Sequence, residues 1–315
     1  MSNLCLTLIT PEGQDHLKAP FIKKVQESLN ANGTMTWLNE SSALDIAFKS
    51  NAPLETLKQN VTAVIDDNPI DFALQPAEGR RKKLLISDMD STIIEEECID
   101  EIAFMAGIKP KIAEITERAM KGELEFNAAL TERVALLEGL ETKALETVIN
   151  ERLHLSKGAV ELVQTMAQNG AYCALVSGGF TFFTEKIAAK TGFHTTQANI
   201  LEINDNTLTG RVIPPILGSA AKKAALITYM AEKNLTALET LAVGDGANDL
   251  EMIMHAGLGI AYKAKPIVGA KADAAVKHTD LTSLLYMQGY KQSEFAKQPQ
   301  YEHPIKKPAR FGGLF

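Results

Sequence analysis

The sequence has few of the features that mark secreted or membrane proteins. Its 315 residues include only three cysteines, Cys5, Cys98 and Cys173, which lie far apart and form no CxxC pair. An odd and dispersed set predicts reduced thiols in a cytoplasmic protein rather than disulfides. No apolar run approaches the length of a membrane span, and no basic stretch followed by a long apolar run opens the chain. We therefore expect neither a membrane partner nor a signal peptide.

Positive charge is also in short supply. Lys and Arg together number 32 against 39 Asp and Glu, which gives a formal net charge of −7 at pH 7. Proteins that bind nucleic acid usually carry a basic excess, so no nucleic-acid partner is expected. A small anionic substrate is still compatible with this composition, because a local group of Arg and Lys is enough to bind it.

The apolar content, 45% of the residues, is sufficient for a large core, and the length suits two domains or one domain with insertions. Residues 1–77 follow the order β-α-β-β-α-β, from the strand-like LCLTLIT to the closing PIDFALQP. This order predicts a ferredoxin-like α+β domain. The polar stretch EGRRKK, residues 78–83, is interpreted as a solvated linker.

The remainder of the chain predicts an α/β domain with an insertion. Strands and helices alternate in residues 84–94 and 154–287, which favours a doubly wound parallel sheet with helices on both faces. Between these two segments, residues 95–153 are a run of helices. The polar and basic residues 288–315 are expected to form a tail, and two alternatives stay open for it: frayed ends, or docking on a neighbour.

Three polar turns each follow an apolar strand. They are DMDST after LLIS, SGG after ALV, and GDGAND after LAV. In parallel sheets ligands bind at the carboxyl ends of the strands, so the three turns are expected to converge on one crevice. The chemistry-bearing residues they would bring together are Asp88, Asp90, Ser177, Gly178, Gly179, Asp245, Asn248 and Asp249.

Four carboxylates in one crevice repel each other unless a cation neutralises them. Oxygen ligands without His or Cys suit Mg²⁺ rather than Zn²⁺. Other motifs fail: an EF-hand would need Gly where Ile93 stands and Glu where Ile99 stands, and GDGAND lacks both the ending of a phosphate-binding P-loop and the third glycine of a dinucleotide fingerprint.

Phosphoryl transfer to a carboxylate is the reaction that remains. Asp88, directly after its strand, would be the nucleophile, and Asp90 would move the protons. Ser177 and nearby amides would bind the phosphate, helped by Lys222 or Lys223. A single Asp after a strand is typical of a cap or a turn. The prediction therefore rests on the three motifs occurring together, in order, each after an apolar strand.

These motifs resemble those of the haloacid dehalogenase superfamily. The longer stretches DMDSTIIEEECIDEIA, LVSGGFTFFTEKIA and LAVGDGANDLEMI are similar to its phosphoserine phosphatase branch, and the resemblance covers roughly residues 83–287. Residues 1–77 resemble the ACT-like extension that some of these enzymes carry. The resemblance implies Mg²⁺-dependent hydrolysis of O-phospho-L-serine through an aspartyl-phosphate, which is the last step of serine biosynthesis, and it implies that residues 95–153 form a cap.

The resemblance also implies roles for individual residues. Asp88, the backbone carbonyl of Asp90 and Asp245 would bind the metal, with Asp249 behind them. Substrate contacts would come from Glu97, Met120, Phe126, Arg133, Ser177, Gly178, Lys222 and Asn248. Arg133 falls within an apolar helical stripe, which calls for an anionic partner. With Glu97, it would complement a zwitterion. For Arg133 two alternatives stay open: snorkelling of the guanidinium to solvent, or an ion pair with a neighbouring Glu.

Three other functions stay open from the sequence alone. One is a relative that passes the phosphoryl group to another hydroxyl acceptor. The second is a phosphatase for a different small phosphomonoester. The third is a regulatory protein whose N-terminal unit, residues 1–76, senses an amino acid. A homodimer is left open as the assembly.

Overall fold

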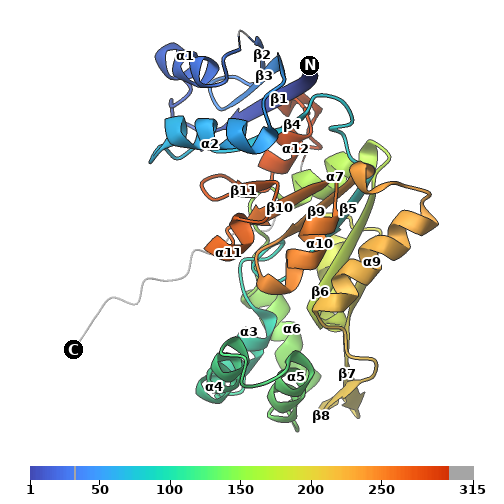
Figure 1. Ribbon diagram of the computed structural model, residues 1–315. Helices are drawn as coiled ribbons and strands as arrows, with labels where there is room; N and C mark the ends of the chain where they lie inside the picture. The colour runs from blue at the N-terminus through green and yellow to red at the C-terminus, as the bar shows by residue number, and fades with distance from the viewer. Residues whose placement is uncertain (32, 298–315) are drawn as a thin grey trace.

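The computed structural model describes residues 1–31 and 33–297. Figure 1 shows an N-terminal unit at one end, an α/β core in the middle and a helical insertion at the other end. The predicted fold class, α/β with a helical insertion and an N-terminal ferredoxin-like unit, is confirmed. In the described part of the chain, no helix combines the length and apolar character needed to cross a membrane. All three cysteines are buried and free.

The N-terminal unit is a four-stranded antiparallel sheet in the order β2-β3-β1-β4. Leu4, Leu6 and Leu8 alternate along the first strand and point to the two helices, which cover that face. This is the strand order of a ferredoxin-like unit. Its elements are β1 (Ser2–Ile9), α1 (Ala19–Ser28), β2 (Thr34–Asn39), β3 (Ala43–Ser50), α2 (Leu54–Ile65) and β4 (Asp71–Pro76).

The core sheet is parallel across the strands that carry the three motifs. Its order is β11-β10-β9-β5-β6-β7, with β8 antiparallel to β7 at the edge. The strands are β5 (Leu84–Ser87), β6 (Tyr172–Phe180), β7 (Thr195–Asn204), β8 (Thr207–Ile213), β9 (Thr240–Gly244), β10 (Leu258–Tyr262) and β11 (Ala274–Val276). The helices are α7 (Ala159–Gln168), α8 (Thr181–Thr191), α9 (Ser219–Glu232), α10 (Leu250–His255), α11 (Pro266–Gly269) and α12 (Ser283–Met287).

The central strand β5 is apolar up to its last residue, Ser87, because both of its faces are covered. Leu84 and Ile86 pack in one cluster with residues of α9 and α10. Leu85 points the other way, into the cluster that contains residues of α7, α8 and α12. Helices on both faces leave the carboxyl end of the sheet as the place where β5 can present polar residues.

The helical insertion leaves and re-enters the core at one place. Ile94 pairs with Leu155 in an isolated bridge, and the Ser156 N–H donates to the carbonyl of Ile93. The insertion consists of α3 (Cys98–Met105), α4 (Lys109–Met120), α5 (Phe126–Ala135) and α6 (Thr142–Glu151). The hairpin of β7 and β8 turns at Asp205 and Asn206, as predicted, with φ values of 48° and 61°.

The sheets of the N-terminal unit and the core are continuous. Phe72 in β4 pairs with Ala275 in β11, so the described residues form one sheet of eleven strands. The carboxylate of Asp71 accepts hydrogen bonds from the N–H groups of residues 277–279 at the junction. The N-terminal unit is therefore fixed to the edge of the core rather than tethered beside it.

The interpretation of residues 78–83 as a solvated linker is wrong for two of its basic residues. The Arg80 guanidinium forms a bidentate ion pair with Asp45, at 2.6 and 3.0 Å, and donates to Thr7 and to the carbonyl of Met287. Lys82 is buried and donates to two backbone carbonyls. Charge and composition suggested a wet connector, whereas these side chains supply polar contacts that hold the N-terminal unit on the core.

The first part of the predicted tail also packs on the core. Gln288 and Tyr290 are 1% exposed, and Ala296 is 7% exposed. The Ala296 N–H donates to the Thr165 hydroxyl in α7. The rest of that predicted segment, residues 298–315, lies outside the described residues.

We expect Arg80→Ala to lower the free energy of unfolding by about 3–5 kcal/mol, because it leaves the buried Asp45 carboxylate without its counter-charge. Arg211→Ala is the control, since Arg211 forms an exposed ion pair with Glu202 and should cost less than about 1 kcal/mol. Denaturant unfolding followed by circular dichroism measures both. Equal losses for the two variants would contradict the structural role given to Arg80.

Candidate active site

The three polar turns meet at one edge of the sheet, as their positions after apolar strands predicted. Asp88 follows β5, which pairs with both β6 and β9. Ser177 lies near the end of β6, and Asp245 follows β9. Three residues far apart in the sequence are therefore neighbours because their strands are neighbours.

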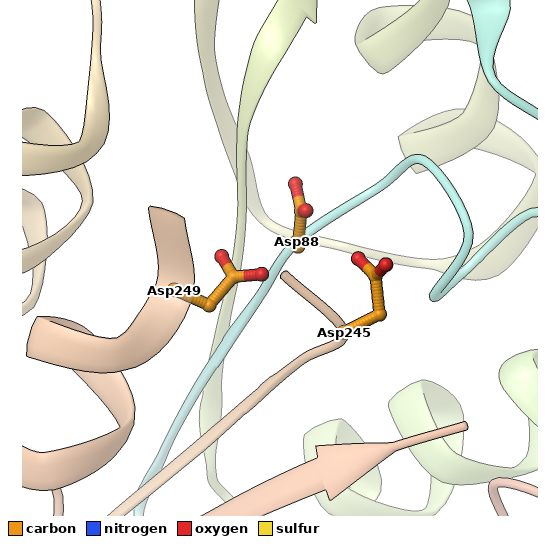
Figure 2. Close-up of side chains that lie close together, drawn as sticks. All are labelled: Asp88, Asp245 and Asp249. Atoms are coloured by element: carbon orange, nitrogen blue, oxygen red, sulfur yellow. The ribbon is translucent and has the colours of Figure 1, made fainter. Parts of the chain in front are cut away.

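Three carboxylates form the centre of this site. Figure 2 shows the side chains of Asp88, Asp245 and Asp249 lying close together. One oxygen from each lies within 4.8 Å of the others. Asp88 and Asp249 are buried, and Asp245 is half-buried. Such an all-oxygen group has the ligand chemistry that Mg²⁺ prefers.

Lys222 is the counter-charge of this group. Its Nζ lies 2.7 Å from Asp88 Oδ1 and 2.6 Å from Asp249 Oδ1, and the residue is only 2% exposed. Burial alone would lower its pKa, but the two carboxylates outweigh burial and raise it, so Lys222 is charged. Lys223, the alternative in the sequence, lies 3.5 Å from Glu251 on a more exposed face. The structure therefore places Lys222, not Lys223, in the site.

One lysine does not balance the negative charge. Burial and then the nearby Asp249 raise the pKa of Asp88 well above its usual value, although Lys222 acts in the opposite direction. Burial and Asp249 also raise the pKa of Asp245 to about 6. Both shifts have the same cause, which is excess negative charge in a poorly solvated place. A divalent cation between these carboxylates would remove that cost, so the residues fit Mg²⁺.

Asp90 is directed away from the three carboxylates. Its Oδ1 accepts the Cys98 N–H at 2.8 Å, and its Oδ2 accepts the Ser177 hydroxyl at 3.1 Å. Ser177 Oγ in turn accepts the Gly179 N–H at 2.8 Å. Asp90 is thereby held beside the second motif, where a proton donor for a leaving group would be needed.

The helical insertion presents one acidic and one basic residue to the site. Glu97 accepts the Ser91 hydroxyl at 2.7 Å. The Glu97 carboxyl is solvent-accessible, yet partial desolvation by the surrounding protein atoms and then the charge of Asp90 raise its pKa to about 7. Burial lowers the pKa of Arg133, and the charge of Glu97 is the largest influence in the opposite direction. Glu97 and Arg133 are thus close enough to interact electrostatically, and the Arg133 Nε–H also donates to the carbonyl of Ala129.

The other predicted residues differ in how they are placed. The Phe126 ring lies over Gly178: a Cβ there would be 3.3 Å from Phe126 Cζ. Asn248 is half-buried, and its side chain lies against Gly246. Met120 is 68% exposed at the end of α4, so most of its side chain faces solvent rather than being enclosed in the site.

Sequence reasoning missed Asn199. This residue is 1% exposed, donates through Nδ2 to the carbonyls of Gly178 and Leu217, at 2.9 and 3.2 Å, and accepts the Leu217 N–H at 2.7 Å. An amide in an otherwise apolar part of a strand was the available signal, since buried polar groups need partners. The partners themselves are remote in the chain and could not be named.

With this geometry established, comparison with known proteins is informative. Residues 85–254 match the model of the haloacid dehalogenase-like hydrolase family. This chain belongs to that family. It is 46% identical over 204 residues to a phosphoserine phosphatase of Streptococcus thermophilus, covering 65% of this chain and 94% of that protein.

Solved structures extend the likeness to the N-terminal unit. A haloacid dehalogenase family hydrolase of Salmonella enterica serovar Typhi superposes with a TM-score of 0.82 at 32% identity, covering 91% of this chain and 98% of that one. A probable phosphoserine phosphatase from Vibrio cholerae does so with a TM-score of 0.75 at 31% identity, covering 93% and 88%. Because each match covers more than nine tenths of this chain, it includes most of the N-terminal unit as well as the core.

Without metal, we expect Asp245→Asn to raise the melting temperature by about 2–6 °C at pH 8. The pKa of Asp245 is raised in the folded state, so above pH 6 its ionised carboxylate destabilises the fold. Below pH 4 the group is protonated in both states, and the gain should vanish. Thermal unfolding in EDTA across this pH range measures the effect; a gain independent of pH would contradict the electrostatic cause.

Proposed function

We propose that this protein hydrolyses O-phospho-L-serine to L-serine and phosphate, as a cytoplasmic enzyme of serine biosynthesis. The observation that carries the proposal is that two pairs of charged side chains lie near each other. Asp88 and Lys222 are arranged for phosphoryl transfer, while Glu97 and Arg133 offer opposite charges to a zwitterion. The similarity to phosphoserine phosphatases supports the same substrate.

Asp88 is the nucleophile in this proposal. In the described residues, its hydrogen bonds from Met89 N–H and Lys222 both go to Oδ1. Oδ2 is then the oxygen that attacks phosphorus, and the bond between phosphorus and the serine oxygen breaks. Lys222 favours the ionised form of Asp88 against the effect of burial, and it can also bind the phosphoryl oxygens.

Asp90 moves the protons. In its acid form it donates to the departing serine oxygen, and as a carboxylate it then takes a proton from the attacking water. Water breaks the bond between Asp88 and phosphorus and releases phosphate. The Cys98 N–H and the Ser177 hydroxyl hold Asp90 in one orientation for both steps.

Asp88, Asp245 and the backbone carbonyl of Asp90 would hold Mg²⁺, with Asp249 anchoring Lys222 behind them. When bound, the ion supplies charge neutralisation at the phosphoryl oxygens. We assign the insertion, residues 95–153, as the cap that covers the substrate. On it, Arg133 binds the substrate carboxylate and Glu97 binds the ammonium group.

Phosphate release from O-phospho-L-serine should be strong with Mg²⁺ and should fall at least about 1,000-fold with EDTA or in Asp88→Asn, because both remove groups that act on the phosphoryl group itself. A colorimetric phosphate assay measures this. Release only from an aryl phosphate, lost in Asp88→Asn, would keep the chemistry and reject the substrate. Transfer to an added alcohol in preference to water would favour a phosphotransferase.

Arg133→Ala should raise KM for phosphoserine at least about tenfold, because a charge-assisted pair to the substrate carboxylate is lost. KM for p-nitrophenyl phosphate, which has no carboxylate, should change less than about twofold. Arg118→Ala, on the same insertion but in an exposed pair with Glu132, is the control and should change neither value. Equal effects of Arg133→Ala on both substrates would reject the zwitterion assignment.

A further inference from the structure

Phe126 bridges two turns of the core that are remote in the sequence. A Cβ added to Gly218 would be 3.2 Å from Phe126 Cδ1 and 3.7 Å from Cε1. A Cβ added to Gly178 would be 3.3 Å from Cζ and 3.7 Å from Cε2. One edge of the ring therefore rests on each glycine, and we call this pair of glycines the Phe126 seat.

The two halves of the seat are held together by one side chain. Asn199 bonds the carbonyl of Gly178 on one side and both backbone groups of Leu217 on the other. It is 1% exposed, so these bonds are protected from water. Because all the bonds come from one short amide, the two turns keep a fixed separation.

Each half of the seat leads directly to a group that handles the phosphate. Gly178 follows Ser177, and Gly218 precedes α9, whose first turns carry Lys222. Phe126 is the first residue of α5, and Arg133 lies two turns further along the same helix. The seat is thus a contact point between the insertion that carries the substrate-recognition residues and the turns that surround Asp88.

Gly218 has no conformational need to be glycine. Its φ is −101° and its ψ is −163°, which is extended backbone that any residue adopts. What a side chain would meet is the Phe126 ring, so glycine at this position permits close approach rather than an unusual turn.

We propose that Gly218 is a positioning residue for the reaction, acting through Phe126. Its bare backbone lets the ring pack down on the seat, and this contact sets the distance between Arg133 and Asp88. A side chain at 218 would lift the N-terminal end of α5 and move the recognition residues away from the phosphoryl group. The inference rests on the proposed function.

The test is a double-mutant cycle between positions 218 and 126. Gly218→Ala should lower kcat/KM for phosphoserine about threefold and Gly218→Val about 30-fold, mainly through KM, because small displacements of a bound substrate cost rate steeply. In a Phe126→Ala background, the same substitutions at 218 should change kcat/KM less than twofold. Gly269→Ala, where an added Cβ would lie 3.8 Å from Ala275, is the control and should leave kcat/KM unchanged.

Melting temperatures separate positioning from folding, since all variants should stay within about 3 °C of their parent. The inference is overturned if Gly218→Val lowers kcat/KM equally with and without the Phe126 ring. It is also overturned if Gly218→Val leaves kcat/KM unchanged while the wild type is active. A wild type that fails to hydrolyse phosphoserine would reject the proposed function and, with it, this inference.

Discussion

The ion-pair arrangement around Lys222 is the constraint on which the site depends. A buried lysine is costly unless its charge is matched, and here two carboxylates from different strand ends match it. The same contacts hold Asp88 and Asp249 in place. Because Asp245 adds a further negative charge, the group remains overcharged, and this is why it suits a divalent cation as well as a phosphoryl group.

This overcharged group is assembled by the surrounding sheet. β5 is buried on both faces, and its neighbours β6 and β9 bring the other motifs to the same edge. The residues proposed for recognition belong to the helical insertion, which is joined to the core by the Ile94–Leu155 bridge and to β8 by the Glu141–Thr207 bridge. The groups proposed for chemistry therefore lie on the sheet and those proposed for recognition on the insertion, and Phe126 links the two layers through Gly178 and Gly218.

The N-terminal unit is joined to the core by a continuous sheet and by polar contacts. Its sheet runs on into the core sheet, and Arg80, Asp45 and Asp71 fill the junction with charged and polar contacts. Such contacts need both sides to be in place, so they favour one orientation of the unit over others. A residue that composition assigns to a flexible connector thus becomes part of the interface.

The sequence by itself determined the fold class, the order of elements and the identity of the motif residues. Apolar strands followed by polar turns are local patterns that can be recognised in the sequence. Because parallel strands end at the same edge of a sheet, these patterns also predict that the polar turns form one site. Only the tertiary structure decided which of Lys222 and Lys223 enters that site, since adjacent residues on a helix face different directions. It also decided the pairing of Arg80 with Asp45, the hydrogen bonds by which Asn199 joins Gly178 to Leu217, and the packing of Phe126 on Gly178 and Gly218. These depend on contacts between segments remote in the chain, which local patterns do not specify.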